Sequence, residues 1–286
     1  MPESDISIEP IEIDSLVSMI KMAYSFENWE RVISLSTTLL DSVKDIRLEQ
    51  SQLINTNKRL NRHISYYFGY SYLMKGLAHQ KLKQYSKSIE CVSYYADLSW
   101  LDDSTESAKI VIEDFHFFSK ANSLTLEILT GNKYKMSEYI DYLENNSDQV
   151  LSGLITILES AIVHHFNIDN ELSLLMRHVR DYSFYKEQVI ASKYLSLQYM
   201  LALYNYLNKK YSDALDYTIH SLVASDKLNN DKYFKKSIAL FEILKTYASV
   251  PQLTEYSNIL NKIFKGEMEN EESFNFSSYF VGSSEQ

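Results

Sequence analysis

Two short stretches, far apart in the chain, carry the same pattern: "KLKQYSKSIECV" at Lys81–Val92 and "LNKKYSDALDYT" at Leu207–Thr218. In both, a polar residue is followed by Tyr, Ser, a second polar residue, a small residue and an aliphatic one. A unit that occurs twice in one chain is typical of repeat architectures, in which neighbouring units bury one another's apolar faces. These two stretches therefore decide which fold class we expect.

The small residues around the first tyrosine have the spacing of a helical hairpin. Gly76 lies nine residues before Tyr85, and Ser88 lies three residues after it. In the second stretch the same places are taken by Ala202, Tyr211 and Ala214. Small side chains allow two helices to approach closely, while the aromatic residue fills the space at the turn. Because one hairpin cannot bury its apolar face alone, we expect an all-α fold in which several hairpins stack into an α-solenoid superhelix.

The composition agrees with a helical chain. Only 6 Gly and 3 Pro occur among 286 residues, which favours long helices joined by short polar turns. Asp14 or Ser15 is expected to cap the first helix and Asn28 the second, while Arg47–Arg62 reads as a loop or an exposed helix. Apolar periodicity predicts further helices at about 63–83, from about 86, and at about 104–130, 134–145, 149–166, 169–181, 184–208, 212–227, 232–247 and 251–265.

Three segments are expected along the chain. Residues 1–12 form a disordered acidic lead, 13–266 form the helical-repeat domain, and 267–286 form a flexible acidic and aromatic tail. The tail either stays disordered or docks in cis through its aromatic side chains. Those side chains are Phe274, Phe276, Tyr279 and Phe280.

Charge and motifs exclude several classes of function. A net charge of −10 argues against direct binding of nucleic acid. No signal pattern and no long apolar run occurs, so we expect a cytoplasmic location and no membrane span. The single cysteine, Cys91, excludes an internal disulfide and is expected to be a buried apolar residue. Nucleotide-binding and metal-binding motifs are absent from the sequence, so we expect no cofactor, no metal and no enzymatic activity.

The hairpin residues resemble the tetratricopeptide repeat. Gly76, Tyr85, Ser88 and Ile89 match its signature, and the proline that usually follows the second helix is missing. The second copy matches about equally, through Leu201, Ala202, Tyr211, Ala214 and Leu215.

A broader stretch, from about 25 to 265, is similar to the repeat region of helix-turn-helix regulators of Gram-positive bacteria, the peptide-pheromone sensors grouped as RRNPP proteins. The likeness is carried by "YYADLSW" (Tyr94–Trp100), "FFSKANSLTLEILTGN" (Phe117–Asn132) and "VLSGLITILESAIVHHFNID" (Val150–Asp169). It implies that a concave face binds a short peptide or a regulatory protein. No helix-turn-helix is recognised in residues 1–60, so a DNA-binding regulator acting as a dimer, and a structural scaffold or oligomer, are kept as alternatives.

The groove of such a repeat is lined by the first helix of each hairpin. Amide side chains and tyrosine hydroxyls would suit an extended peptide, because its backbone presents unpaired donors and acceptors. The predicted peptide-binding or partner-binding residues are Tyr70, Leu73, Leu77, Gln80, Lys81, Asn122, Ser196, Tyr199, Leu203, Asn205 and Tyr206. The alternative for each is that it packs against a neighbouring helix.

Overall fold

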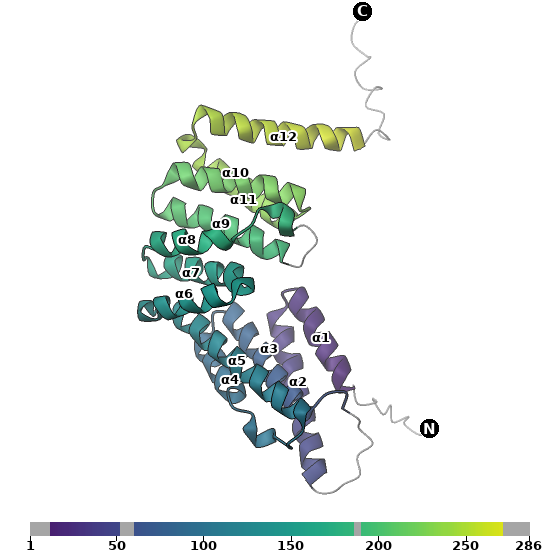
Figure 1. The fold of residues 1–286 in the computed structure, drawn as a ribbon. Helices are drawn as coiled ribbons and strands as arrows, with labels where there is room; N and C mark the ends of the chain where they lie inside the picture. Colours follow the sequence, from purple (N-terminus) through teal and green to yellow (C-terminus); the bar gives the residue numbers. More distant parts are fainter. Residues whose placement is uncertain (1–11, 52–59, 186–189, 271–286) are drawn as a thin grey trace, which may run out of the picture. The chain divides into compact units, whose positions relative to one another are not determined.

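A computed structural model describes residues 12–51, 60–185 and 190–270. Within these ranges the chain forms twelve α-helices and several short 3-10 turns, and no β-strand occurs (Figure 1). The predicted all-α class is confirmed. The helices pack into two compact units, with the boundary between Tyr142 and Leu143.

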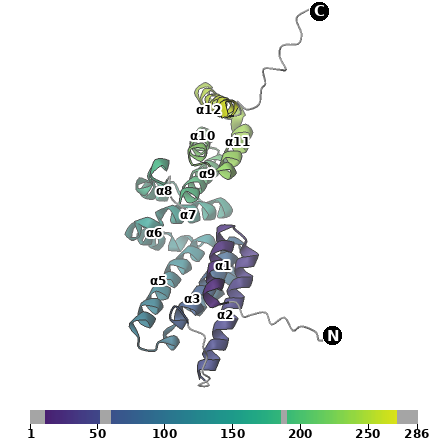
Figure 2. The same cartoon turned by 90° about the vertical axis from the view of Figure 1, so that its right-hand side faces the viewer.

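The first unit is a layered arrangement of antiparallel helices. Its helices are α1 (Ile13–Ser25), α2 (Trp29–Ser51), α3 (Ile64–Lys81), α4 (Tyr85–Tyr95), α5 (Glu106–Leu129) and the start of α6 (Met136–Asn145). Helix α2 packs on α1 and α3 (Figure 2), and α3 packs on α4 and α5. Helix α3 therefore has neighbours on several sides, which explains why its sequence is apolar nearly all round.

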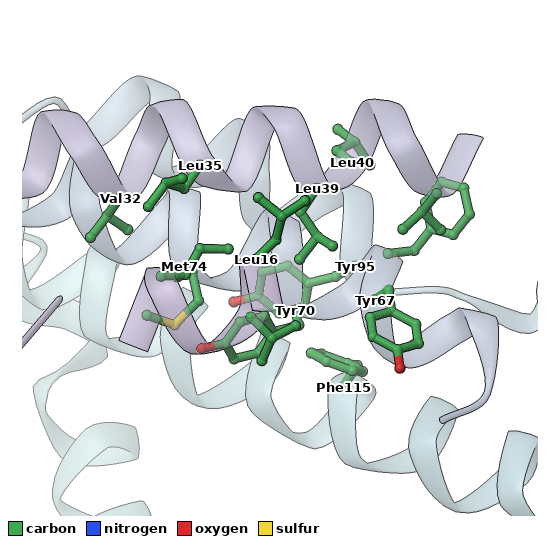
Figure 3. Close-up of a cluster of buried hydrophobic side chains, with 14 of the residues drawn as sticks. Leu16, Val32, Leu35, Leu39, Leu40, Tyr67, Tyr70, Met74, Tyr95 and Phe115 are labelled. Carbon is green, nitrogen blue, oxygen red and sulfur yellow. The ribbon is translucent and has the colours of Figure 1, made fainter. Parts of the chain in front are cut away.

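The core of the first unit mixes aliphatic side chains with large aromatic ones (Figure 3). Leu16 from α1 and Leu39 from α2 face Tyr67 of α3, Tyr95 of α4 and Phe115 of α5, and all five are 3% exposed or less. Buried tyrosines need a partner for the hydroxyl group. Most of the aromatic residues here fill seams between helices.

The second unit repeats the antiparallel arrangement. Its helices are α7 (Val150–His164), α8 (Asp169–Leu175), α9 (Ala191–Leu207), α10 (Tyr211–Lys227), α11 (Asp231–Leu244) and α12 (Val250–Asn270). Helix α9 packs on α7 and α10, and α10 packs on α11 and α12. Ala202, Leu215 and Phe241 are completely buried in its core, where the Phe241 ring stacks on Tyr256 with centroids 3.7 Å apart.

One kind of turn closes five of the helices. In each, the second residue of a three-residue connection has a positive φ between 50° and 87°. These residues are Glu27, Lys83, Gly131, Lys209 and Asn229.

The turn after α3 shows how this connection works. The N–H of Lys83 donates to the carbonyl of Gln80 at 2.9 Å, and the N–H of Gln84 donates to that of His79 at 2.8 Å. These two bonds define a Schellman motif, which satisfies the last helical carbonyls while it reverses the chain. The other four turns have the same pair of bonds, so these five short connections share one physical design.

The close approach expected of the Gly76 hairpin is confirmed. The Ser88 hydroxyl donates to the Gly76 carbonyl at 2.9 Å, and a Cβ on Gly76 would lie 3.1 Å from that of Cys91. Ala202 and Ala214 are completely buried at the equivalent places in the second unit. Cys91 is buried as expected, and its burial raises the pKa of the thiol to about 11.

The two hairpins differ at the position after the small residue. Ile89 is 51% exposed, whereas Leu215 is completely buried. Helix α10 is covered by α11 and α12, while α4 ends after 11 residues at Tyr95. The equivalence of the two copies is therefore local to the turn and the small residues.

The predicted cap at Asp14 or Ser15 is wrong, and the reason is a tertiary contact. Helix α1 begins at Ile13, after Glu12, and no side chain caps it. Asp14 instead accepts the Tyr67 hydroxyl proton at 2.8 Å and an Asn61 amide proton at 2.7 Å. Burial and the bond to this carboxylate raise the pKa of Tyr67 to about 12.

Other helix boundaries divide into confirmed and corrected predictions. Asn28 caps α2 as expected, with its side chain accepting the Arg31 N–H at 3.1 Å. The helix predicted at 169–181 ends at Leu175 and continues only as a 3-10 turn. The helix predicted from residue 184 begins at Ala191.

Helix α2 reaches Ser51, inside the stretch predicted as a loop or exposed helix. The predicted lead lies outside the described residues except for Glu12. Helix α12 extends to Asn270, and the aromatic part of the tail lies outside the described residues. No helix in the described part of the chain is both long and apolar enough for a bilayer crossing.

Replacing Lys83 or Lys209 with glycine should stabilise the protein. A side chain in the left-handed region costs about 1–2 kcal/mol, and glycine adds about 0.5–1 kcal/mol of unfolded-state entropy. We therefore expect each variant to gain about 0.5–1 kcal/mol in the free energy of unfolding, measured by urea denaturation. Lys120→Gly, in the middle of α5, is the matched control and should lose about 1 kcal/mol. A loss at Lys83 or Lys209 as large as that of the control would contradict the assigned turn.

Gly69→Ala should destabilise the first unit. A Cβ at this position would lie 2.4–2.6 Å from three ring atoms of Phe115, which is buried and has little room to move. Overpacking of this kind costs about 1–3 kcal/mol. The double variant with Phe115→Leu should recover part of the loss, and a thermodynamic cycle of unfolding free energies measures the coupling. If the two changes in unfolding free energy are strictly additive, the contact with Phe115 is not the reason why alanine destabilises position 69.

Candidate binding pocket

The predicted residues of α3 lie in or against the core of the first unit. Tyr70 is 8% exposed and its ring stacks on Tyr66, with centroids 5.5 Å apart. Leu73 and Leu77 pack against the same hydrophobic cluster. At the end of the helix, Gln80 is half-buried and Lys81 is exposed. Tyr70, Leu73 and Leu77 therefore pack against neighbouring helices, which is the alternative to peptide binding that we gave for each predicted residue.

Asn122, on α5, is also engaged within the first unit. Its amide donates a hydrogen bond of 2.8 Å to the hydroxyl of buried Tyr95. This bond satisfies the tyrosine hydroxyl inside the core.

Four of the five predicted residues of α9 form a stripe that faces the last helices. Tyr199, Leu203 and Tyr206 pack against the core cluster of α10, α11 and α12, and Ser196 is half-buried. The Tyr199 ring meets Tyr233 of α11 edge-on, with centroids 6.3 Å apart. Asn205, the fifth residue, lies on the neighbouring stripe.

Asn205 lines a pocket of about 660 Å³ in the second unit. Helices α8, α9 and α10 and the connection that follows α8 form its walls. The connection contributes Met176, Val179, Arg180 and Asp181. A volume of this size is typical of sites for small ligands and short peptide segments. We refer to it as the α8–α10 pocket.

One stripe of α9 forms the floor of the pocket: Tyr194, Gln198, Leu201 and Asn205. Their spacing, at i, i+4, i+7 and i+11, puts them on one helical face. Gln198 is 4% exposed and Asn205 is 7% exposed, so two amides lie buried at the pocket floor. Gln198 is not among the binding residues predicted from the sequence. The signal that could have indicated it was a pair of amides, seven residues apart, in a helix whose other residues are mostly apolar.

Helix α10 forms the acidic wall. It contributes Asp213, Asp216, Tyr217 and His220, again at helical spacing. Asp216 accepts a hydrogen bond of 2.7 Å from Gln252 of α12, and the same amide donates to the Ser212 carbonyl at 3.2 Å. Gln252 is 7% exposed, so α12 fixes this wall from behind.

At the α8 end, a polar cluster joins three segments of the second unit. The Lys210 ammonium donates to Asp169 at 2.7 Å, and the hydroxyl of buried Tyr204 donates to the same carboxylate at 3.1 Å. The Ile168 N–H donates to the Tyr204 hydroxyl at 3.0 Å. The bond from Lys210, followed by that from Asn167, lowers the pKa of Asp169. The Asp169 carboxylate is therefore ionised, and the Lys210 ammonium balances its charge.

A tyrosine–histidine pair lies at the opposite end. The Tyr194 hydroxyl and the His220 Nε2 atom share a hydrogen bond of 2.6 Å. Burial lowers the pKa of His220, and the nearby Asp181 carboxylate only partly opposes it. Burial raises the pKa of Tyr194, and the Asp181 charge acts in the same direction. Both groups are therefore neutral near pH 7.

The pocket offers hydrogen bonding and negative charge. Asp181, Asp213 and Asp216 line it in addition to Asp169, and Arg180 is the cation among its lining residues. Among the described residues, no group of three or more histidine, cysteine or carboxylate side chains is arranged to hold a metal ion. These side chains suit an elongated polar ligand that carries a positive charge.

No family model, no curated protein and no solved structure matches this chain. The resemblance to peptide-sensing regulators therefore stays a prediction, and the pocket and its chemistry are what indicate a function.

The stability of the protein should depend on His220 in mild acid. The folded protein holds the His220 pKa below its ordinary value of 6.5, so the unfolded chain binds the proton more readily. The contribution of neutral His220 to the free energy of unfolding is therefore fully present above pH 6.5 and is lost as the pH falls toward the lowered pKa. His220→Gln should flatten the profile of unfolding free energy between about pH 6.5 and about pH 5, with exposed His164→Gln as the control. Equal slopes in the wild type and His220→Gln would contradict the lowered pKa.

Proposed function

We propose that this protein is a non-enzymatic regulatory binding module, which holds a short peptide, free or as a segment of a partner protein, in the α8–α10 pocket. We further propose that its hairpins are tetratricopeptide-like repeats. The proposed ligand belongs to the class expected from the sequence. The proposed binding site, however, is centred on the stripe of α9 that contains Asn205.

The recurring turn supports the repeat interpretation. Five connections with one Schellman geometry, and small buried residues at Gly76 and Ala202, are what a chain of similar helical hairpins requires. Hairpins of this kind expose one helical face to ligands while the other face packs.

The observation that carries the proposal is the buried amide pair on the pocket floor. Gln198 and Asn205 are two helical turns apart, a separation of about 10.5 Å along α9. The Asn205 amide donates to the Leu201 carbonyl at 2.9 Å, which leaves its oxygen available as an acceptor. An extended peptide presents backbone N–H and C=O groups along both edges, and such amides can bind them without regard to side-chain identity.

The same pocket suggests the length and charge of the peptide. The floor from Tyr194 to Asn205 spans about 16 Å, and an extended chain advances about 3.4 Å per residue. About five residues therefore fit along it. Because the residues that line the pocket include Asp181, Asp213 and Asp216 but one cation, Arg180, we expect at least one basic residue in the ligand.

Binding can be tested on the full chain with pools of random heptapeptides, sorted by net charge. We expect a basic pool to raise the midpoint of thermal unfolding, because a ligand at a hundred times its dissociation constant adds about 2.7 kcal/mol of stability. Peptides isolated from that pool are then titrated by calorimetry at several salt concentrations. Screening weakens a merely electrostatic association steeply, whereas the amide contacts persist.

Asn205→Ala and Asp213→Asn should each weaken binding about tenfold, because a hydrogen bond to a charged or buried group is worth about 1.5 kcal/mol. Asn208→Ala is the matched control, since its amide makes the same bond to the carbonyl four residues earlier but is exposed outside the pocket. An absence of binding by every pool, or equal losses in Asn205→Ala and Asn208→Ala, would refute this function.

A further inference from the structure

A second pocket, of about 380 Å³, lies in the first unit and has no part in the proposed function. It is formed by the later part of α2, the start of α3 and the chain between α4 and α5. Its polar lining includes Arg47, Arg62, His63 and two carboxylates, and its apolar lining includes Trp100 and Leu60. We refer to it as the Arg47 pocket.

The guanidinium groups of both arginines of this pocket lie over aromatic rings. The guanidinium carbon of Arg47 is 4.0 Å from the centroid of Trp100, and that of Arg62 is 4.3 Å from the centroid of Tyr66. Stacking uses the face of the guanidinium and leaves the N–H groups at its edge directed sideways. Those edges match the planar geometry of a carboxylate or a phosphate.

Neither guanidinium group is paired with an anion in the described part of the chain. The Nη1 atom of Arg47 is buried and has no hydrogen-bond partner. A buried donor without an acceptor is rare in folded proteins and calls for an explanation, such as a missing ligand. Residues 52–59, which lie outside the described residues, contain no carboxylate.

The two carboxylates of the pocket are engaged elsewhere. Asp103 accepts from the Thr105 N–H at 3.0 Å and from its hydroxyl at 2.6 Å, and it also lies 3.2 Å from His63 Nε2. The bond from the Thr105 hydroxyl, followed by the bond from the Thr105 N–H, lowers the pKa of Asp103. Asp102 accepts from the Ser104 N–H at 2.8 Å. These bonds build the turn before α5, and neither carboxylate forms an ion pair with Arg47 or Arg62.

Helix α3 adds to the positive potential. It begins at Ile64, which lines the pocket, and it runs for 18 residues to Lys81. The positive end of its dipole is therefore at the pocket.

We propose that the Arg47 pocket binds a small organic oxyanion, a carboxylate or a phosphate ester, with its oxygens on the edges of Arg47 and Arg62. The apolar body of the ligand packs against Trp100 and Leu60. This site is independent of the peptide pocket, because it belongs to the other unit and rests on other residues.

Trp100 provides a direct reporter, since the chain has one other tryptophan, Trp29. In a Trp29→Phe background, the fluorescence of Trp100 is followed while benzoate, phenyl phosphate or neutral benzyl alcohol is added at constant ionic strength. We expect a saturable change with at least one of the two anions, and the comparison between them identifies the preferred oxyanion. Benzyl alcohol should give no saturable change.

Arg47→Gln and Arg62→Gln should each weaken anion binding at least tenfold. Lys44→Gln, on the exposed side of the same helix as Arg47, removes one charge outside the pocket and should leave the affinity unchanged. Arg62 is exposed, so its variant is expected to fold even if Arg47→Gln does not, and circular dichroism verifies folding of both. The proposal is overturned if neither anion binds saturably, if benzyl alcohol binds as tightly, or if folded Arg62→Gln retains full affinity.

Discussion

Two antiparallel helices can pack directly after one another only if the chain reverses within a few residues and still satisfies the last helical carbonyls. Here a single residue with left-handed backbone geometry does both, with one hydrogen bond donated by its own N–H and a second by the N–H of the next residue. Four of the five residues in this position are not glycine, so the reversal is made at a cost in backbone strain. The packing between paired helices compensates for this cost.

That packing depends on where side chains are small. Gly76 allows the Ser88 hydroxyl to reach a helix backbone, and Gly69 leaves the space that the Phe115 ring occupies. The large aromatic residues can then fill the remaining seams. In the second unit, the same close packing of α9 and α10 brings a row of amides beside a row of carboxylates, so the pocket is a product of the hairpin geometry.

Features that depend on neighbouring residues could be predicted from the sequence, and those that depend on distant partners could not. The helical class, the short connections, the Asn28 cap and the small residues of the Gly76 hairpin are local properties, and all four are confirmed. Asp14 looked like a cap because capping is the common local use of aspartate, but its partner Tyr67 lies 53 positions away in the chain.

For the pocket, the limit was helical symmetry. Helix α9 is apolar on nearly all sides, so periodicity alone could not distinguish the stripe of Tyr199 and Leu203 from that of Gln198 and Asn205. The walls from α8 and α10 break this symmetry, and they become visible only in three dimensions. The stacking of Arg47 on Trp100 likewise joins residues whose sequence positions give no sign of contact.

The one cysteine of the chain lies under the Gly76 hairpin, shielded from solvent and with its thiol held in the protonated form at neutral pH. Only the thiolate attacks alkylating reagents, and it must be accessible to do so. The rate at which such a reagent modifies the native protein therefore measures how often α3 and α4 separate. Cys91 is thus a natural reporter of the rate of local opening, so no engineered label is needed.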